Sequence, residues 1–270
     1  MIQDVPFLSV ILPVYNEGEA LRANVVRALK FLRTSDWTFE VVAVNDGSTD
    51  GSLQVLQELA RENPELVLVT YSKNVGKGNA IQEGIARTRG KWLVTLDSDL
   101  ELPIEQIKTF LGVQAATGAQ IVIGSKWHPE SQIDYPAGRK KLSRGLHLVV
   151  RVFFPLRVTD TQVGIKLMEG NSVRFVSHTT LVKRFAWDIE FLLVSNLYGL
   201  KIAEAPITLI YSREGLGRVE IRTILQIGRE VAGIWYRYHI RGFYSRSLAN
   251  WSRNNGLPAR LNNSLQRDAS

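Results

Sequence analysis

The chain has 270 residues, of which 45% are hydrophobic, 22% are charged and none is cysteine. This composition suits a folded chain with a substantial core, and it excludes disulfides, thiolate metal sites and a cysteine nucleophile. The net charge of +7 is uneven, because residues 1–125 carry 11 basic and 15 acidic side chains whereas residues 126–270 carry 22 and 11. The basic half indicates an anionic partner, such as a phosphate, a nucleic acid or an anionic membrane surface.

Apolar strands alternate with amphipathic helices along the first 125 residues. Strands are expected at 7–14, 39–44, 66–71, 92–96 and 120–123, and helices at 17–33, 52–62, 78–87 and 103–117. Continuous apolar strands separated by helices predict an α/β fold, a mostly parallel sheet covered by helices on both faces. Ligands of such sheets bind outside the carboxyl ends of the strands.

The pattern changes after Gly124. Residues 126–138 and 212–218 have the composition of loops. A polar turn leads into a further strand over 160–167 and short strands follow over 201–211, while helices are expected over 139–154, 186–198 and 219–243. Asparagine, serine, arginine and glycine dominate the end of the chain, so we expect disorder over 244–270.

Polar side chains gather at the carboxyl ends of four predicted strands. The last of these ends carries Asp97-Ser98-Asp99, and Glu101 follows two positions later. Alternate residues of an extended chain point the same way, so Asp97, Asp99 and Glu101 are expected to converge. Three neighbouring carboxylates repel one another unless a cation lies among them, and a hard divalent cation such as Mg²⁺ or Mn²⁺ prefers oxygen ligands. A solvated acidic turn is the alternative.

Several motifs occur in a fixed order along the chain. They are residues 9–17 (Ser-Val-Ile-Leu-Pro-Val-Tyr-Asn-Glu), 44–51 (Val-Asn-Asp-Gly-Ser-Thr-Asp-Gly), 74–78 (Asn-Val-Gly-Lys-Gly), 97–99 (Asp-Ser-Asp), 124–126 (Gly-Ser-Lys), 160–166 (Asp-Thr-Gln-Val-Gly-Ile-Lys) and 186–190 (Ala-Trp-Asp-Ile-Glu). Together they resemble the GT-A-fold glycosyltransferases of family 2. The later motifs resemble the branch that contains the dolichyl-phosphate glucosyltransferases and dolichyl-phosphate mannose synthases. The resemblance covers about residues 7–240.

The resemblance implies that the donor is a nucleotide-diphospho-sugar. It gives nucleotide-sugar contacts to Pro13, Tyr15, Glu17, Asp46, Lys77, Asp97, Asp160 and Gln162. Pro13, Tyr15 and Glu17 would lie near the base and ribose, and Asp46 would bond the base edge. Asp97, Asp99 and Glu101 would hold Mg²⁺ or Mn²⁺, which stabilises the leaving diphosphate. Alternative roles are open for Asp46 as a turn former and for Glu17 as a first-turn residue.

The acceptor decides whether a catalytic base is needed. A lipid phosphate already carries negative charge, so it needs cations that hold it in line rather than a base. The resemblance assigns this to Lys126 with Arg139 and Lys140, although a solvated helix face is also open for these residues. Asp188 or Glu190 would orient sugar hydroxyls, or act as the base if the acceptor is an alcohol. The expected catalytic residues are therefore Asp97, Asp99, Lys126 and Asp188.

The leading hypothesis is an inverting, metal-dependent hexosyltransferase. It moves glucose, or next mannose, from a UDP- or GDP-sugar to a polyprenyl or dolichyl phosphate. One alternative is transfer to a polysaccharide or protein hydroxyl, and another is a non-enzymatic module that binds an anionic ligand or a membrane. No recognisable nucleic-acid motif is present, so nucleic acid is not an expected partner.

The predicted organisation is one GT-A domain over 1–243. It comprises a nucleotide-sugar half (1–125), an acceptor half (126–218) and a helix (219–243) suited to an anionic membrane surface, to packing on the sheet or to a partner subunit. Neither a secretory signal nor a membrane-spanning run is visible. We therefore expect a protein peripheral on the cytoplasmic membrane face, with a membrane partner protein or a homo-oligomer left open.

Overall fold

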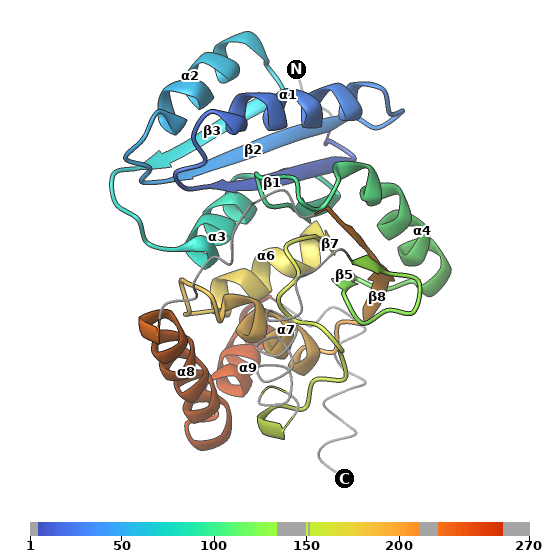
Figure 1. The fold of residues 1–270 in the computed structure, drawn as a ribbon. Coiled ribbons are helices and arrows are strands. Elements are labelled where there is room, and N and C mark those ends of the chain that lie inside the picture. Colours follow the sequence, from blue (N-terminus) through green and yellow to red (C-terminus); the bar gives the residue numbers. More distant parts are fainter. Residues whose placement is uncertain (1–4, 134–149, 151, 211–220, 256–270) are drawn as a thin grey trace.

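A seven-stranded sheet forms the centre of the computed structural model, which describes residues 5–133, 150, 152–210 and 221–255 (Figure 1). The strand order is β3-β2-β1-β4-β7-β5-β8. Among these strands neighbours run parallel, except that β7 lies antiparallel between β4 and β5. The bounds are β1 (Leu8–Val14), β2 (Phe39–Asp46), β3 (Leu66–Tyr71), β4 (Trp92–Thr95), β5 (Ile121–Ser125), β7 (Lys166–Glu169) and β8 (Ile202–Pro206). The predicted mostly parallel α/β sheet is confirmed.

Helices cover both faces of this sheet, as expected from its continuous apolar strands. Val10 and Leu12 of β1 pack on one side with α1 (Ala20–Arg33), α2 (Ser52–Glu62) and α4 (Ile107–Thr117). Ile11 points to the other side, where α3 (Lys77–Arg87), α6 (Gly170–Thr179) and α7 (Trp187–Leu197) lie (Figure 1). Burial on both faces explains why the strands are apolar throughout rather than alternating.

The second half of the chain contributes to the same sheet. The strand expected after the polar turn at 160–167 is β7, and α6, for which no helix was predicted, follows it directly. Two short strands, β6 (Gln132–Ile133) and β9 (Thr208–Leu209), form a separate parallel pair, and a short 3₁₀ helix, η1 (Ile104–Gln106), precedes α4. The nucleotide-sugar and acceptor halves therefore share one framework.

The expected disorder after residue 244 is wrong for the first part of that segment. The helix expected over 219–243 is present as α8 (Ile221–Trp235), followed by a π-helical turn, η2 (Tyr236–Ile240). A further helix, α9 (Phe243–Asn255), comes next. Tyr244 and Leu248 are four residues apart and so share one helical face, and each is 1% exposed. Polar composition concealed this apolar pair. None of the helices that the structure describes combines the length and the hydropathy of a membrane-spanning segment.

The burial of Leu248 predicts that α9 stabilises the fold. Leu248→Ala should lower the free energy of unfolding by about 2–4 kcal/mol, because it removes buried methyl groups and leaves a cavity. The matched control is Leu225→Ala on α8, where the side chain is 68% exposed, and it should change stability by about 0.5 kcal/mol or less. Urea unfolding measures both. Equal effects of the two substitutions would show that α9 does not pack on the domain.

Candidate active site

The loops after β1 and β2 are tied together at the carboxyl edge of the sheet. The backbone N–H groups of Asn16 and Glu17 donate to the hydroxyls of Ser48 and Ser52, each at 3.1 Å. The Gly18 N–H donates to Asp50 at 3.0 Å. This bracing holds one wall of the predicted nucleotide site. This wall contains Pro13, Tyr15 and Glu17. The Tyr15 side chain is 45% exposed and so accessible to a ligand.

Asp46 supports the neighbouring loop. Its Oδ1 accepts from the Val75 N–H at 2.8 Å, and its Oδ2 accepts from the Gly76 N–H and the Asn74 amide, each at 2.9 Å. The side chain is also buried. Asp46 thus places residues 74–76 at the start of α3, and its expected contact with a nucleotide base stays a prediction.

Lys77 begins α3 and lies directly against the acidic motif. Its Nζ is 2.5 Å from Asp97 Oδ1. Burial opposes the charge of Lys77, but the carboxylates of Asp97, Asp188 and Asp99 together raise its pKa. Lys77 therefore remains a cation throughout the physiological pH range, at a place where three carboxylates act on it.

The Asp97 carboxylate is also enclosed by the loop that precedes β7. Thr95 Oγ1 donates to the Gly164 carbonyl at 3.1 Å. A Cβ at Gly164 would overlap the Asp97 carboxylate, so a larger residue there would displace this carboxylate from its present position. The two predicted motifs, 97–99 and 160–166, therefore meet.

The acidic motif does not continue as an extended strand, and the assignment of Asp97, Asp99 and Glu101 to one metal ion stays a prediction. The Leu100 N–H donates to the Asp97 carbonyl at 3.1 Å, and Leu100 has a left-handed φ of +51°. The Glu101 N–H then donates to Asp99 Oδ1 at 3.2 Å. This turn breaks the extended geometry that would align alternate residues. In the part of the chain that the structure describes, no three potential ligand side chains group around one metal position.

Lys126 and Asp160 form a pair on the acceptor side. Their Nζ and Oδ2 atoms are 3.0 Å apart, and both side chains are largely buried. Glu204 of β8 accepts from the Thr159 and Asp160 N–H groups and so holds the turn in place. Lys126 is therefore neutralised by Asp160 in this structure. The other predicted acceptor residues, Arg139 and Lys140, lie outside the described residues.

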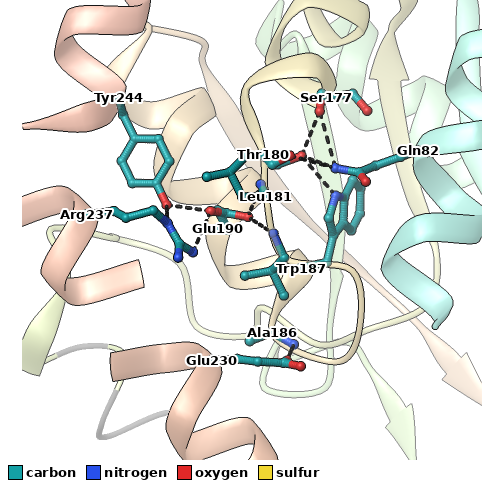
Figure 2. Close-up of polar contacts among 11 residues, drawn as sticks. Gln82, Ser177, Thr180, Leu181, Ala186, Trp187, Glu190, Glu230, Arg237 and Tyr244 are labelled. Atoms are coloured by element: carbon teal, nitrogen blue, oxygen red, sulfur yellow. Dashed lines mark hydrogen bonds and ion pairs between the residues drawn. The ribbon is translucent and has the colours of Figure 1, made fainter. Parts of the chain in front are cut away.

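Asp188 and Glu190, the two residues expected near the sugar, have different environments. Asp188 Oδ1 lies 2.7 Å from the Nζ of the buried Lys166 and lines a cavity. Glu190 is fully buried and accepts from Arg237 and Tyr244 of the C-terminal segment (Figure 2). A role for Glu190 in orienting sugar hydroxyls is therefore wrong, because its carboxylate is already engaged away from the cavity.

A cavity of about 230 Å³ lies between α3 and the start of α7. It is lined by Lys77, Gly78, Ile81, Gln162, Arg184, Phe185, Trp187 and Asp188. The Gln162 Nε2 is buried and has no hydrogen-bond partner among the described residues. A buried donor without a partner costs free energy, so this amide is suited to an oxygen atom of a ligand.

The cavity joins Lys77, Gln162 and Asp188, which the sequence predicted, and adds residues that it did not. Arg184 and Phe185 line it, and Lys166 supports it from beneath. The available signals were the basic pair at 183–184 just before the 186–190 motif and the lysine that ends the 160–166 motif. Neither signal specified a direction for the side chain.

Comparison with known proteins identifies the family. The family model described as glycosyl transferase family 2 matches residues 9–180, which is more than half of the chain. The chain belongs to glycosyl transferase family 2. The resemblance drawn from the motifs is thereby confirmed.

Relatives of this family 2 glycosyltransferase include two proteins named dolichyl-phosphate beta-glucosyltransferase. The one from Trichomonas vaginalis is 33% identical over 74% of this chain and 65% of its own length. The one from Homo sapiens is 30% identical over 86% of this chain and 75% of its own. The chain thus spans about two thirds to three quarters of these relatives.

Solved structures agree with the GT-A fold. Glucosyl-3-phosphoglycerate synthase of Mycobacterium tuberculosis in complex with UDP superimposes with a TM-score of 0.62 at 20% identity, over 86% of this chain and 79% of that one. Its complex with Mn²⁺, UDP and glucosyl-3-phosphoglycerate gives 0.60 at 22% identity, with the same coverage. At this identity the likeness establishes the fold alone.

The loop bracing of the family 2 domain should weaken in acid through Asp50. The Ser52 side chain, and then the backbone N–H groups of Ser52 and Gly18, lower the pKa of Asp50. The contribution of Asp50 to stability is therefore complete above the ordinary pKa of an aspartate. It is lost as the pH falls through the lowered pKa that Asp50 has in the folded protein. Asp50→Ala should cost about 1 kcal/mol at pH 7, because its hydrogen bonds to the Gly18 and Ser52 N–H groups are lost, and it should cost less below pH 3.8. Urea titrations from pH 7 to 3 measure this. The exposed Asp36→Ala serves as control, and a cost that stays constant with pH would contradict the assignment.

Proposed function

We propose that this family 2 glycosyltransferase is an inverting enzyme that moves glucose from UDP-glucose to a polyprenyl or dolichyl phosphate. The observation that carries the proposal is the position of Lys77, a cation among three carboxylates on the wall of the cavity. The two dolichyl-phosphate beta-glucosyltransferases support the choice of sugar and acceptor. A GDP-sugar such as GDP-mannose is the next candidate donor.

The donor would lie along the carboxyl edge of the sheet. The braced loops that hold Tyr15 and Glu17 would receive the base and ribose, and Lys77 would contact the diphosphate. An ammonium next to a leaving diphosphate stabilises the charge that develops on it. Lys77 would then exchange part of its contact with Asp97 for phosphate oxygens. Gln162 and Asp160 would line the sugar, with the Gln162 amide donating to a sugar oxygen.

Asp97 and Asp99 fit a divalent cation such as Mg²⁺ or Mn²⁺. Mg²⁺ in nucleotide sites is bound through one or two carboxylates together with substrate phosphates, so a third protein carboxylate is not required. Solved complexes of the tuberculosis synthase with Mn²⁺ or Mg²⁺ support this choice. When bound, the cation supplies Lewis-acid stabilisation of the diphosphate. Glu101 is the weaker candidate, because the turn at Leu100 takes it out of register.

A phosphate acceptor explains why the cavity needs no free base. Asp188 is engaged by Lys166 and is placed to accept hydrogen bonds from sugar hydroxyls. Lys126, with Arg139 and Lys140 of the segment 134–149, would hold the acceptor phosphate. If the acceptor were instead an alcohol, Asp188 would have to accept its proton. Asp188→Asn would then abolish turnover, while Lys126→Met would have little effect.

We further propose a peripheral location on the cytoplasmic face of a membrane, and the C-terminal helices support the membrane contact. Tyr236 and Ile240 of η2 are 49% and 60% exposed. Val152 and Phe153 are also exposed, at 67% and 46%. The two segments touch, because His239 Nε2 lies 2.9 Å from the Phe153 carbonyl. Residues 221–255 carry six arginines and one glutamate. Exposed apolar side chains within a basic segment suit an anionic bilayer surface.

The catalytic proposal is tested with a panel of labelled UDP- and GDP-sugars, a short polyprenyl phosphate and Mg²⁺ or Mn²⁺. We expect a glucose-linked lipid product from UDP-glucose. Asp99→Asn should lower kcat by about 100-fold or more, in the range of a lost transition-state charge contact. Asp36→Asn on the surface is the control and should leave kcat unchanged. Absence of a lipid product with every donor, or full activity of Asp99→Asn, would overturn the proposal.

The membrane proposal has its own test. Tyr236→Ser together with Ile240→Ser should weaken sedimentation with phosphatidylserine vesicles by about tenfold, because apolar area is lost from the interface. Val26→Ser provides the control, since Val26 is 47% exposed on α1. Vesicle binding that is equally reduced by both variants, or by neither, would contradict a docking role for η2.

A further inference from the structure

Glu190 is a buried carboxylate that joins two parts of the chain. Its Oε2 accepts from the backbone N–H groups of Leu181 and Val182, at 2.7 and 2.6 Å. Its Oε1 accepts from the Arg237 guanidinium at 2.9 Å and from the Tyr244 hydroxyl. One oxygen therefore serves the segment before α7, and the other serves the C-terminal helices (Figure 2).

The C-terminal partners are themselves fixed. Arg237 Nε donates to the Tyr244 hydroxyl at 2.9 Å, and that hydroxyl is the donor to Glu190. Burial and then the Glu190 carboxylate raise the pKa of Tyr244, so the phenol keeps its proton. The π-helical turn η2 supplies Arg237, and α9 supplies Tyr244.

The segment held by Glu190 leads directly to the cavity. We call residues 181–186 the donor-site loop. Its Lys183 carbonyl accepts from the Asn79 N–H at 2.8 Å, within the first turn of α3. Gly76, at φ +124°, packs so closely on this loop that a Cβ there would lie 2.6 Å from the same carbonyl. Arg184 and Phe185 of the loop line the cavity beside Lys77.

A second contact from the C-terminal helices reaches the end of this loop. The Ala186 N–H donates to Glu230 of α8 at 3.0 Å (Figure 2). Ala186 immediately precedes α7, whose first turn carries Asp188. Both ends of the donor-site loop are therefore bonded to acidic side chains, one of which is itself held by Arg237 and Tyr244.

We propose that Arg237 and Tyr244 are positioning residues of the donor site. Acting through Glu190, they fix the donor-site loop against α3 and thereby set the placement of Lys77 and Asp188 in the cavity. Neither residue lines the cavity, so they act on the reaction through the loop. The kinetic part of this inference rests on the proposed glucosyl transfer, whereas its structural part does not.

The test compares two deletions of a buried phenol hydroxyl. Tyr244→Phe removes the donor to Glu190. Tyr198→Phe removes a hydroxyl whose hydrogen bond, to Thr179 Oγ1 at 3.2 Å, involves neither Glu190 nor the donor-site loop. Both tyrosines are 1% exposed. This pair matches the chemistry and burial of the change while differing in its connection to the loop.

We expect Tyr244→Phe to speed hydrogen exchange of the Leu181 and Val182 amides by about tenfold, since loss of a bond to their acceptor favours local opening. It should also lower kcat/KM for the donor by about tenfold, because a loosened loop misplaces the groups that contact the sugar nucleotide. Tyr198→Phe should leave both quantities within twofold of wild type, with a similar change in thermal midpoint.

Arg237 provides a second and independent variant. Arg237→Met leaves Glu190 without its cation and should lower kcat/KM by about 100-fold. Arg237→Lys keeps the charge but cannot bond Glu190 and Tyr244 through two nitrogens, and it should restore about half of that loss on a logarithmic scale. If Tyr244→Phe fails to fold, hydrogen exchange of the Leu181 and Val182 amides is compared between Arg237→Lys and wild type instead.

Two results would overturn the inference. One is equal exchange at Leu181 and Val182 in Tyr244→Phe and Tyr198→Phe, and the other is faster exchange spread over the whole domain. Failure of the proposed function has a different signature. Wild type would then make no product with any donor, while the exchange comparison would still decide the role of Tyr244 and Arg237.

Discussion

The structure places a lysine beside three carboxylates of the candidate site. Lys77 pairs with Asp97, Lys126 with Asp160 and Lys166 with Asp188. Each pair joins residues that are distant along the chain, so folding brings the charges together. Without the lysines, carboxylates this close would repel one another and resist burial. In the proposed reaction, Lys77 and Lys126 would meet phosphate groups, whereas the buried Lys166 would keep its contact with Asp188.

Much of the architecture could be predicted from the periodicity of apolar residues along the chain and from composition. Continuous apolar runs separated by helices gave the parallel sheet, and strand ends gave the rim where Lys77, Asp97 and Asp188 gather. Directions of side chains could not be predicted in the same way. Glu190 is two residues from Asp188, yet it points to Arg237 because helical neighbours two apart face different ways. The left-handed Leu100 turns the chain before Glu101, and no pattern of charges reveals a φ angle.

The C-terminal segment shows a second limit of composition. Polar residues outnumber apolar ones in α9, and the segment was therefore expected to be disordered. Tyr244 and Leu248 lie on one helical face and pack into the core of the domain, and Phe243 packs beside them. The hydroxyl of Tyr244 then connects this helix to Glu190. A helix whose mean composition is polar thus contributes both to the core and to the support of the donor-site loop.

The position of β7 has a consequence for how the chain is made. β7 lies between β4 and β5, but it is synthesised more than 40 residues after β5. A nascent chain that has reached Ser125 therefore holds two strands with unpaired inner edges. Such edges invite pairing with other chains. The sheet can close only once Lys166–Glu169 has emerged, so a ribosome paused before that point would expose the unpaired edges of β4 and β5. A fragment ending at residue 125 would be prone to aggregate for the same reason.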